Sequence, residues 1–202
     1  MPTALYRLIL AALLLLPFAA HASDAEDFIN ANPMQQAKLL QDWAAQPDPA
    51  RIELVDALQQ GQLNVNGETK TVRLNNRLRG LIDNVQASQQ LLAADPKVRL
   101  AAAQTLQKSA QPAQLKFLDQ QVAAETNEAV HTALSLALAN LQLVDPDPVI
   151  RLAAVRLLGS TGDPLARTRL EALLAPGVET DAAVHTAAET LSLIHISEPT
   201  RL

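Results

Sequence analysis

The chain lacks cysteine altogether, which excludes a disulfide framework, a thiolate metal site and a thiol nucleophile. Aromatic residues are almost as scarce, with five in 202 residues, and strands are usually rich in aromatic and β-branched side chains. The six glycines are scattered, so no phosphate-binding loop with closely spaced glycines and a lysine can be assembled. The apolar fraction of 49% is largely Ala and Leu, which are strong helix formers, and composition therefore predicts an all-α protein.

Positive charge is also in short supply. Without Arg7, Arg201 and Glu198, which lie outside residues 23–190, the 16 basic and 21 acidic residues become 14 and 20, a net charge of −6. Binding of nucleic acid requires a basic face, and single strands are usually stacked on aromatic side chains. We therefore expect no nucleic-acid partner.

The first 22 residues have the pattern of a secretory signal peptide. Arg7 supplies the positive start, Leu8–Phe18 is an apolar run, and Ala20-His21-Ala22 is a small-x-small cleavage site. We expect cleavage before Ser23. An uncleaved anchor is the alternative, although the run is shorter than the ~20 residues that span a bilayer. An exported chain without cysteine suits a bacterial periplasm.

The last residues form a segment of different character. The run from Leu191 to Arg201, LSLIHISEPTR, resembles the in-frame translation of a transposase adapter used to build sequencing libraries. We therefore expect residues 191–202 to be a non-native tail and the natural protein to continue beyond Thr190. The alternative is a genuine short C-terminal strand. His195 and Ser197 are accordingly not interpreted as catalytic or metal-binding residues.

Residues 23–94 are predicted to form an N-terminal helical region with one hairpin. Two short helices are expected over Met34–Ala45 and Pro49–Gln60. Asn66-Gly67 lies between two short β-type runs, which predicts a tight hairpin within residues 62–73. A longer helix follows from Leu74, and its apolar stripe is expected to comprise Leu74, Leu78, Leu81, Ile82, Val85 and Leu92.

Residues 95–190 contain an internal repeat. The segment DPKVRLAA at 95–102 recurs as DPVIRLAA at 147–154, and VHTA at 130–133 recurs at 184–187. Each unit is predicted to contain three helices, at 96–109, 112–124 and 127–143 in the first and at 148–160, 164–175 and from 181 in the second. A repeat of this length is typical of a helical solenoid.

The residues of the repeated segments also predict helix caps and buried helix faces. Asp95 and Asp147 precede Pro at the first helical position, so both are expected to act as N-caps. Helical spacing predicts one inner stripe of Val130, Ala133, Leu134, Ala137 and Leu138, and another of Ile150, Ala153, Ala154, Leu157 and Leu158. The pattern Asp-x-x-Val/Ile-Arg-x-x-Ala resembles HEAT repeats, and the resemblance implies an Asp–Arg ladder between adjacent units. The fold expected is an all-α, HEAT-like or armadillo-like solenoid with one small hairpin.

Two histidines are the most conspicuous candidates for site chemistry. His131 and His185 occupy equivalent positions in the two VHTA segments, which would suit a pair of metal ligands. No second ligand lies at i+4 and the two lie one repeat apart, so a structural position on a helix flank is the favoured interpretation.

The other polar groups also have structural interpretations. Asp24, Glu26 and Asp27 are expected at a frayed terminus, and Asp145 and Asp147 at a helix cap. Arg73, Arg77 and Arg79 form a local basic cluster, either a solvated helix start or a docking patch. No nucleophile, base and orienting acid can be grouped from the sequence. We therefore predict no catalytic, cofactor-binding or metal site, no cofactor, and a protein that is not an enzyme.

Residues 23–190 as a whole resemble the N-terminal extracytoplasmic region of a bacterial urea ABC transporter permease, which is a permease of the branched-chain amino-acid type. The resemblance is carried by the leader, by LNNRLR at 74–79, by DPKVRLAA at 95–102, and by the order of helix, Asn-Gly hairpin and HEAT-like units. It implies a fragment on the periplasmic face of the inner membrane that scaffolds urea transport. Its implied partners are the remainder of the permease, a periplasmic urea-binding protein and, through the full-length permease, ABC ATPase subunits. The membrane-spanning permease that the resemblance implies is absent from this chain, so no pore or substrate residue is assigned.

A free periplasmic HEAT-repeat adaptor, unrelated to transport, is the alternative function. The next codons of the native gene separate the two, because a long multi-span hydrophobic region supports the permease and a stop codon supports the adaptor.

Overall fold

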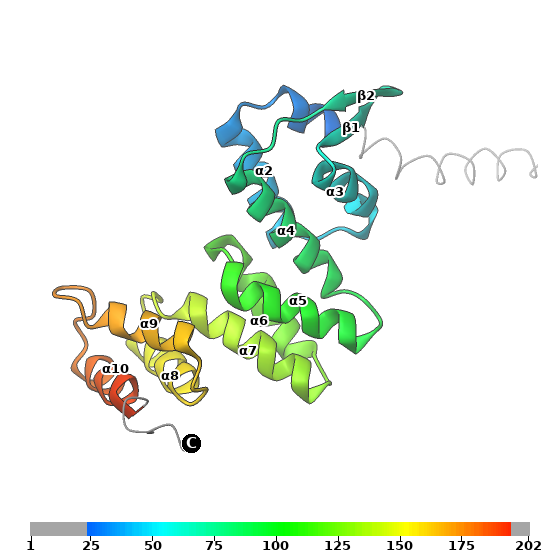
Figure 1. Ribbon diagram of the computed structural model, residues 1–202. Helices are drawn as coiled ribbons and strands as arrows, with labels where there is room; N and C mark the ends of the chain where they lie inside the picture. The colour runs from blue at the N-terminus through cyan, green and yellow to red at the C-terminus, as the bar shows by residue number, and fades with distance from the viewer. Residues whose placement is uncertain (1–23, 195–202) are drawn as a thin grey trace, which may run out of the picture. The chain divides into compact units, whose positions relative to one another are not determined.

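The computed structural model describes residues 24–194, and both the predicted signal peptide and residues 195–202 lie outside the described residues. The fold is all-α with a helical-repeat organisation and one small antiparallel hairpin (Figure 1). The described residues divide into two compact units, 24–94 and 95–194. Each unit is described separately.

The first unit packs helices around a core that contains two of the scarce aromatic residues. Residues 24–30 are helical, and α2 (Pro33–Ala45), η1 (Pro49–Arg51) and α3 (Ile52–Gln59) follow. Asn32 caps α2 by accepting hydrogen bonds from the N–H groups of Met34 and Gln35, both at 3.0 Å. The Phe28 and Trp43 rings lie 5.8 Å apart, and Arg51 lies over the Trp43 ring. The two predicted short helices are thus confirmed, the second with a 3₁₀ first turn.

The predicted hairpin is also confirmed. Strands β1 (Gln62–Val65) and β2 (Glu68–Thr71) pair antiparallel, with Val65 opposite Glu68. Asn66 and Gly67 both have positive φ, at 54° and 83°, which is the conformation that the tight turn requires and that Asn and Gly tolerate best. Leu63 and Val65 are buried, and β1 packs beside α3 (Figure 1).

The long helix α4 (Asn76–Gln90) begins two residues later than predicted. Asn75 is its N-cap, accepting a hydrogen bond from the N–H of Leu78 at 2.9 Å. Most of the predicted stripe is buried, but Leu92 is exposed and Leu91 is buried in its place. The helix ends at Gln90, so the turn that follows breaks the helical spacing on which the prediction for Leu92 depended.

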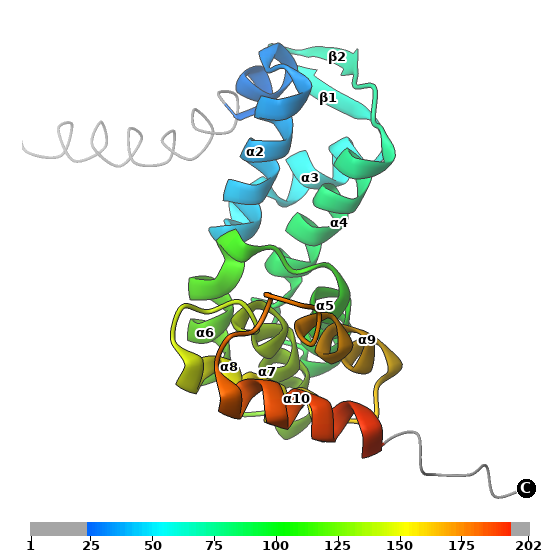
Figure 2. The ribbon, with the colours of Figure 1, turned by 90° about the vertical axis from the view of Figure 1, so that its left-hand side faces the viewer.

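The second unit consists of the two predicted three-helix repeats. The first contains α5 (Pro96–Ser109), η2 (Pro112–Gln114) with α6 (Leu115–Ala124), and α7 (Glu128–Gln142). The second contains α8 (Pro148–Gly159), α9 (Pro164–Leu173) and α10 (Ala182–Ile194). Helix α7 packs against both α5 and α8, and α10 packs against α8 and α9, as Figure 2 shows for α10 and α8. The repeats therefore stack through α7 and α8.

The predicted caps are confirmed, whereas one of the two predicted stripes needs correction. The side chains of Asp95 and Asp147 accept hydrogen bonds from the N–H groups of Lys97 and Val149, both at 2.8 Å. All five residues of the α7 stripe are buried. In α8 the buried side is formed by Ala154, Val155, Leu158 and Gly159, while Ala153 and Leu157 are exposed. The α8 stripe is rotated because Val155 and Gly159, rather than Ala153 and Leu157, contact the neighbouring helices.

Helix α10 continues past Thr190 into the predicted tail. Leu191 packs against the core cluster of the second repeat, and Ser192 is buried. A Cβ atom placed on Gly159 would lie 2.5 Å from the Cδ1 atom of Leu191, so the glycine allows this close approach. Leu191 and Ser192 thus lie in a packed helix and not in the alternative short strand, while the adapter origin of residues 191–202 stays a prediction.

Candidate functional site

Each repeat contains a buried ion pair at the same place. In the first, Arg99 donates from Nε to Glu125 Oε2 at 2.7 Å and from Nη2 to Oε1 at 2.9 Å. In the second, Arg151 and Glu179 form the same two bonds at 2.7 and 2.9 Å. The glutamate side chains are 5% and 2% exposed, so these bidentate pairs differ from ordinary surface salt bridges. We call the two pairs the repeat clamps.

The repeat clamps tie the first helix of each repeat to the loop that precedes its third helix. Besides the arginine, Glu125 accepts hydrogen bonds from the N–H groups of Thr126 and Asn127, at 3.0 and 2.8 Å. Glu179 accepts likewise from the N–H of Asp181 at 2.8 Å. Asn127 and Asp181 in turn cap α7 and α10. The clamps therefore fix where the third helix of each repeat begins.

The electrostatics of the clamps follow from this geometry. The hydrogen bonds from Arg99 lower the pKa of Glu125 from 4.5 to about 2, against the opposing effect of burial, and backbone N–H groups assist. Arg151 lowers the pKa of Glu179 to about 2 in the same way. Both carboxylates are ionised at neutral pH, which is the state that holds the arginines.

The clamps differ from the arrangement that the HEAT resemblance implied. Arg99 and Arg151 pair with a glutamate of their own repeat, whereas the resemblance implies an Asp–Arg ladder between adjacent repeats. Asp95 and Asp147 serve as helix caps. Asp145 and Asp181 act on Arg151 through electrostatics without a salt bridge, so the ladder itself stays a prediction.

The two clamp glutamates were missed in the sequence, although a signal for them exists. Glu125-Thr126-Asn127 and Glu179-Thr180-Asp181 recur at the same 54-residue offset as the two VHTA segments that follow them. Extending that alignment by a few residues towards the N-terminus would have found the repeated glutamate. Its pairing with arginine depends on the fold.

An open groove lies between α5 and α7 of the first repeat. It has a volume of about 530 Å³ and combines small or apolar side chains with a few polar ones. Its lining residues are Leu100, Gln104, Gln107, Glu128, Ala129, Thr132, Ala133 and Leu136. Gln107 is held in place, since its Nε2 donates to the carbonyl of Ala133 at 3.1 Å. The groove offers hydrogen-bonding groups on an extended surface.

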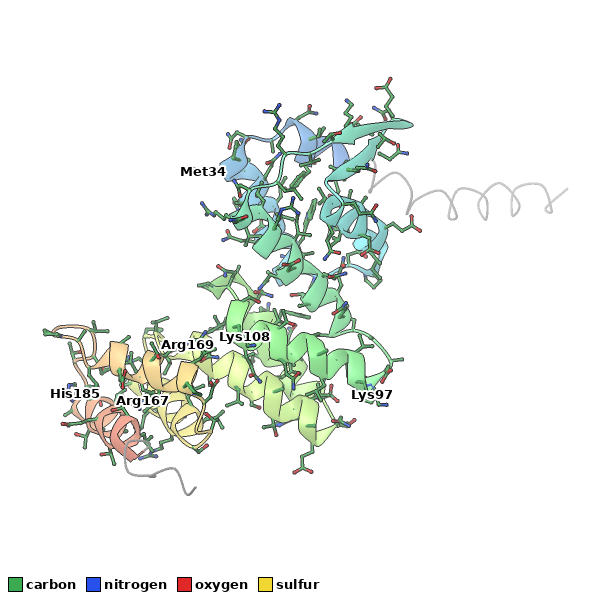
Figure 3. The ribbon with its side chains drawn as sticks, viewed as in Figure 1. Met34, Lys97, Lys108, Arg167, Arg169 and His185 are labelled. Carbon is green, nitrogen blue, oxygen red and sulfur yellow. The ribbon has the colours of Figure 1, made fainter. Side chains whose placement is uncertain are left out.

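The two histidines are not brought together. His131 lies exposed in the first turn of α7, and His185 lies half-buried in the equivalent turn of α10, labelled in Figure 3. Within residues 24–194, no group of three or more His, Cys, Asp and Glu side chains is placed to hold a metal ion.

The N-terminal carboxylates are more ordered than expected. Asp24, at the start of a helix rather than at a frayed end, accepts a hydrogen bond from Arg51 Nε at 2.6 Å. Glu26 accepts one from the side chain of Asn66 at the hairpin turn. These acids therefore join the first helical segment to η1 and to the hairpin. The prediction of a frayed terminus was wrong for Asp24 and Glu26.

The remaining candidates occupy helix ends. Ser160 and Thr161 donate from their hydroxyl groups to the carbonyls of Leu157 and Leu158, both at 2.7 Å, at the C-terminus of α8. Arg73, Arg77 and Arg79 are exposed before and within the first turn of α4.

A scan against protein-family models and a search of curated proteins both find no match to the chain. Among the helices within residues 24–194, none is both long and apolar enough to cross a membrane.

Proposed function

We propose that this chain is the exported N-terminal part of a urea ABC transporter permease, where it acts as a non-catalytic interaction or scaffolding module. The interaction role is supported by the pair of repeat clamps. Each clamp fixes the start of the third helix of its repeat, so the two stacked repeats present a preorganised surface. Rigid repeats present extended surfaces that suit a protein partner, and preorganisation reduces the entropy lost on binding. The proposed location is the periplasmic face of the inner membrane.

The transport part of the proposal is supported by the sequence resemblance. Two of its segments lie at positions with defined roles, residues 74–79 at the capped start of α4 and residues 95–102 at the capped start of α5. The second segment includes Arg99 of the first repeat clamp. The proposed partners are the remainder of the permease and a periplasmic urea-binding protein, with ABC ATPase subunits engaged through the full-length permease.

The sequence of the native gene beyond the codon for Thr190 tests the transport part. A long region encoding several hydrophobic spans is expected. A stop codon shortly after that position would instead favour the free periplasmic adaptor, for which the same repeat surface would serve as the binding module.

The proposed module is not expected to bind urea itself. A small, neutral and strongly hydrated ligand needs an enclosed pocket with several convergent donors and acceptors. The groove between α5 and α7 carries amides at Gln104 and Gln107, but it is open to solvent. Calorimetry of the full chain with millimolar urea should show no saturable heat. Saturable submillimolar binding that Gln104→Ala weakens would make the domain a receptor for urea and contradict the scaffold role.

A further inference from the structure

Three exposed valines lie close in sequence to residues of the second repeat clamp. Val144, Val149 and Val178 have 79%, 72% and 57% of their surface exposed. Val144 precedes Asp145, whose carbonyl accepts from Arg151 Nη1 at 2.8 Å, and Val178 precedes Glu179, the clamp partner of Arg151. Val149 lies two residues before Arg151 in the first turn of α8. Three separate segments thus bring one valine each to the surroundings of a single guanidinium, and we call these residues the valine patch.

The valine patch is held in a fixed arrangement. Arg151 bonds to the loop before α8 through the carbonyls of Asp145 and Pro146, and to the loop before α10 through Glu179. Glu179 is almost fully buried. The loops that carry Val144 and Val178 are therefore fixed to the start of α8, and binding to the patch would require little further ordering.

The fold itself does not require Val149 and Val178. In the first repeat their equivalents are Lys97 and Ala124, at the 52- and 54-residue offsets, whereas Val144 corresponds to Leu92, which is also exposed. That repeat forms the same clamp with the same two distances. Val149 and Val178 therefore do not serve the clamp, and exposed aliphatic side chains near one another are typical of an interaction surface.

The charge around the patch indicates the chemistry of its partner. Asp145, Asp147 and Asp181 lie beside it, and each accepts a hydrogen bond from a nearby backbone N–H. Within the described part of the chain, none of these three carboxylates forms a salt bridge. Arg151 pairs with Glu179, and Asp145 and Asp181 act on Arg151 only through longer-range electrostatics. A second copy of the chain would bring the same negative charges to the contact and would be repelled.

We propose that the valine patch is a docking site for a cationic amphipathic segment of a partner protein. Leucine-like side chains of that segment would cover the three valines, and its Lys or Arg side chains would lie against Asp145, Asp147 and Asp181. The inference deepens the proposed interaction role and rests on that role, not on the link to urea transport.

The test uses the full chain with valine methyl groups labelled for NMR. The probe is an amphipathic Leu/Lys helical peptide of about 15 residues, and the control peptide has Glu at every Lys position. The Leu/Lys peptide should shift the methyl signals of Val144, Val149 and Val178, with an affinity that falls as salt is added. Signals that shift mainly elsewhere, or equal binding of the two peptides, would overturn the proposal.

The decisive variant carries both Val149→Lys and Val178→Ala, which are the residues of the first repeat. We expect at least about tenfold weaker peptide binding, equivalent to ~1.4 kcal/mol, with an unchanged circular dichroism spectrum. Met34→Lys is the matched control, because Met34 is 79% exposed in the first unit, is labelled in Figure 3, and acquires the same charge. An equal loss in both variants would show a nonspecific charge effect and contradict the proposal.

Neutral phosphatidylcholine vesicles provide a further arm of the test. One outcome would be that the chain binds the vesicles, that the double variant does not, and that the Leu/Lys peptide does not bind. That outcome would identify a lipid surface as the partner and overturn the proposal of a protein partner. A stop codon after Thr190 would remove the transport proposal and leave the outcome of these peptide titrations unaffected.

Discussion

Glu179→Gln removes the negative charge of the second repeat clamp and keeps the size of the side chain. Glu179 is 2% exposed and its pKa is held at about 2 instead of 4.5, chiefly by hydrogen bonds from Arg151. A difference of this size corresponds to roughly 3 kcal/mol, at about 1.36 kcal/mol per pKa unit. Hydrogen bonds to charged groups contribute about 1.5–3 kcal/mol each. We therefore expect the free energy of unfolding of the second unit to fall by about 2–3 kcal/mol at pH 7.

Thermal unfolding followed by circular dichroism measures this loss. For a unit of this size the expected decrease in Tm is about 10 °C or more. Glu171→Gln is the matched control, because Glu171 pairs with Arg167 on the surface with its side chain 48% exposed, and such pairs contribute about 1 kcal/mol or less. A loss of similar size in both variants would refute the argument from burial.

The pH dependence provides an independent check of the same reasoning. The pKa of Glu179 is lower in the folded than in the unfolded chain, so the ionised clamp stabilises the fold above pH 4.5. That stabilisation is lost as the pH falls through about 2. The gap in stability between the wild type and Glu179→Gln should therefore narrow between these pH values. A constant gap over this range would mean that the charge of Glu179 does not stabilise the fold.

The remaining predictions concern helix packing and export. Ala154→Asp should lower the free energy of unfolding by about 3 kcal/mol or more, because it buries an unpaired charge. The same change at exposed Ala153 should lower it by less than about 0.5 kcal/mol. Similar losses for the two variants in urea unfolding would contradict the assignment of the buried and exposed sides of α8. Gly159→Ala should cost about 1–3 kcal/mol in the same assay through the clash with Leu191, whose Cδ1 and Cβ atoms lie 2.5 and 2.7 Å from the added methyl group; an unchanged stability would contradict this close approach. Expressed in a Gram-negative host, the chain should yield a mature form that begins at Ser23, and mass spectrometry showing an intact leader on exported protein would disprove cleavage.

The sequence by itself determined the elements whose signals are local. Asp95-Pro96 and Asp147-Pro148 predicted the start of two helices, because a capping side chain and a proline act on the nearest N–H groups. Asn66-Gly67 predicted the hairpin, because these residues tolerate the positive φ of a tight turn. The repeated segments predicted the two three-helix units, and periodicity in α7 predicted its buried side.

Only the tertiary structure decided which side chains meet. Glu125 lies 26 residues from Arg99, and no pattern within one helix indicates that the two form a buried bidentate pair. The rotation of α8 and the packing of Leu191 on Gly159 depend on the neighbouring helices. Helical spacing gives the side of a helix to within about one residue, or 100° of rotation, whereas close packing selects among these rotations through the shapes of the contacting side chains.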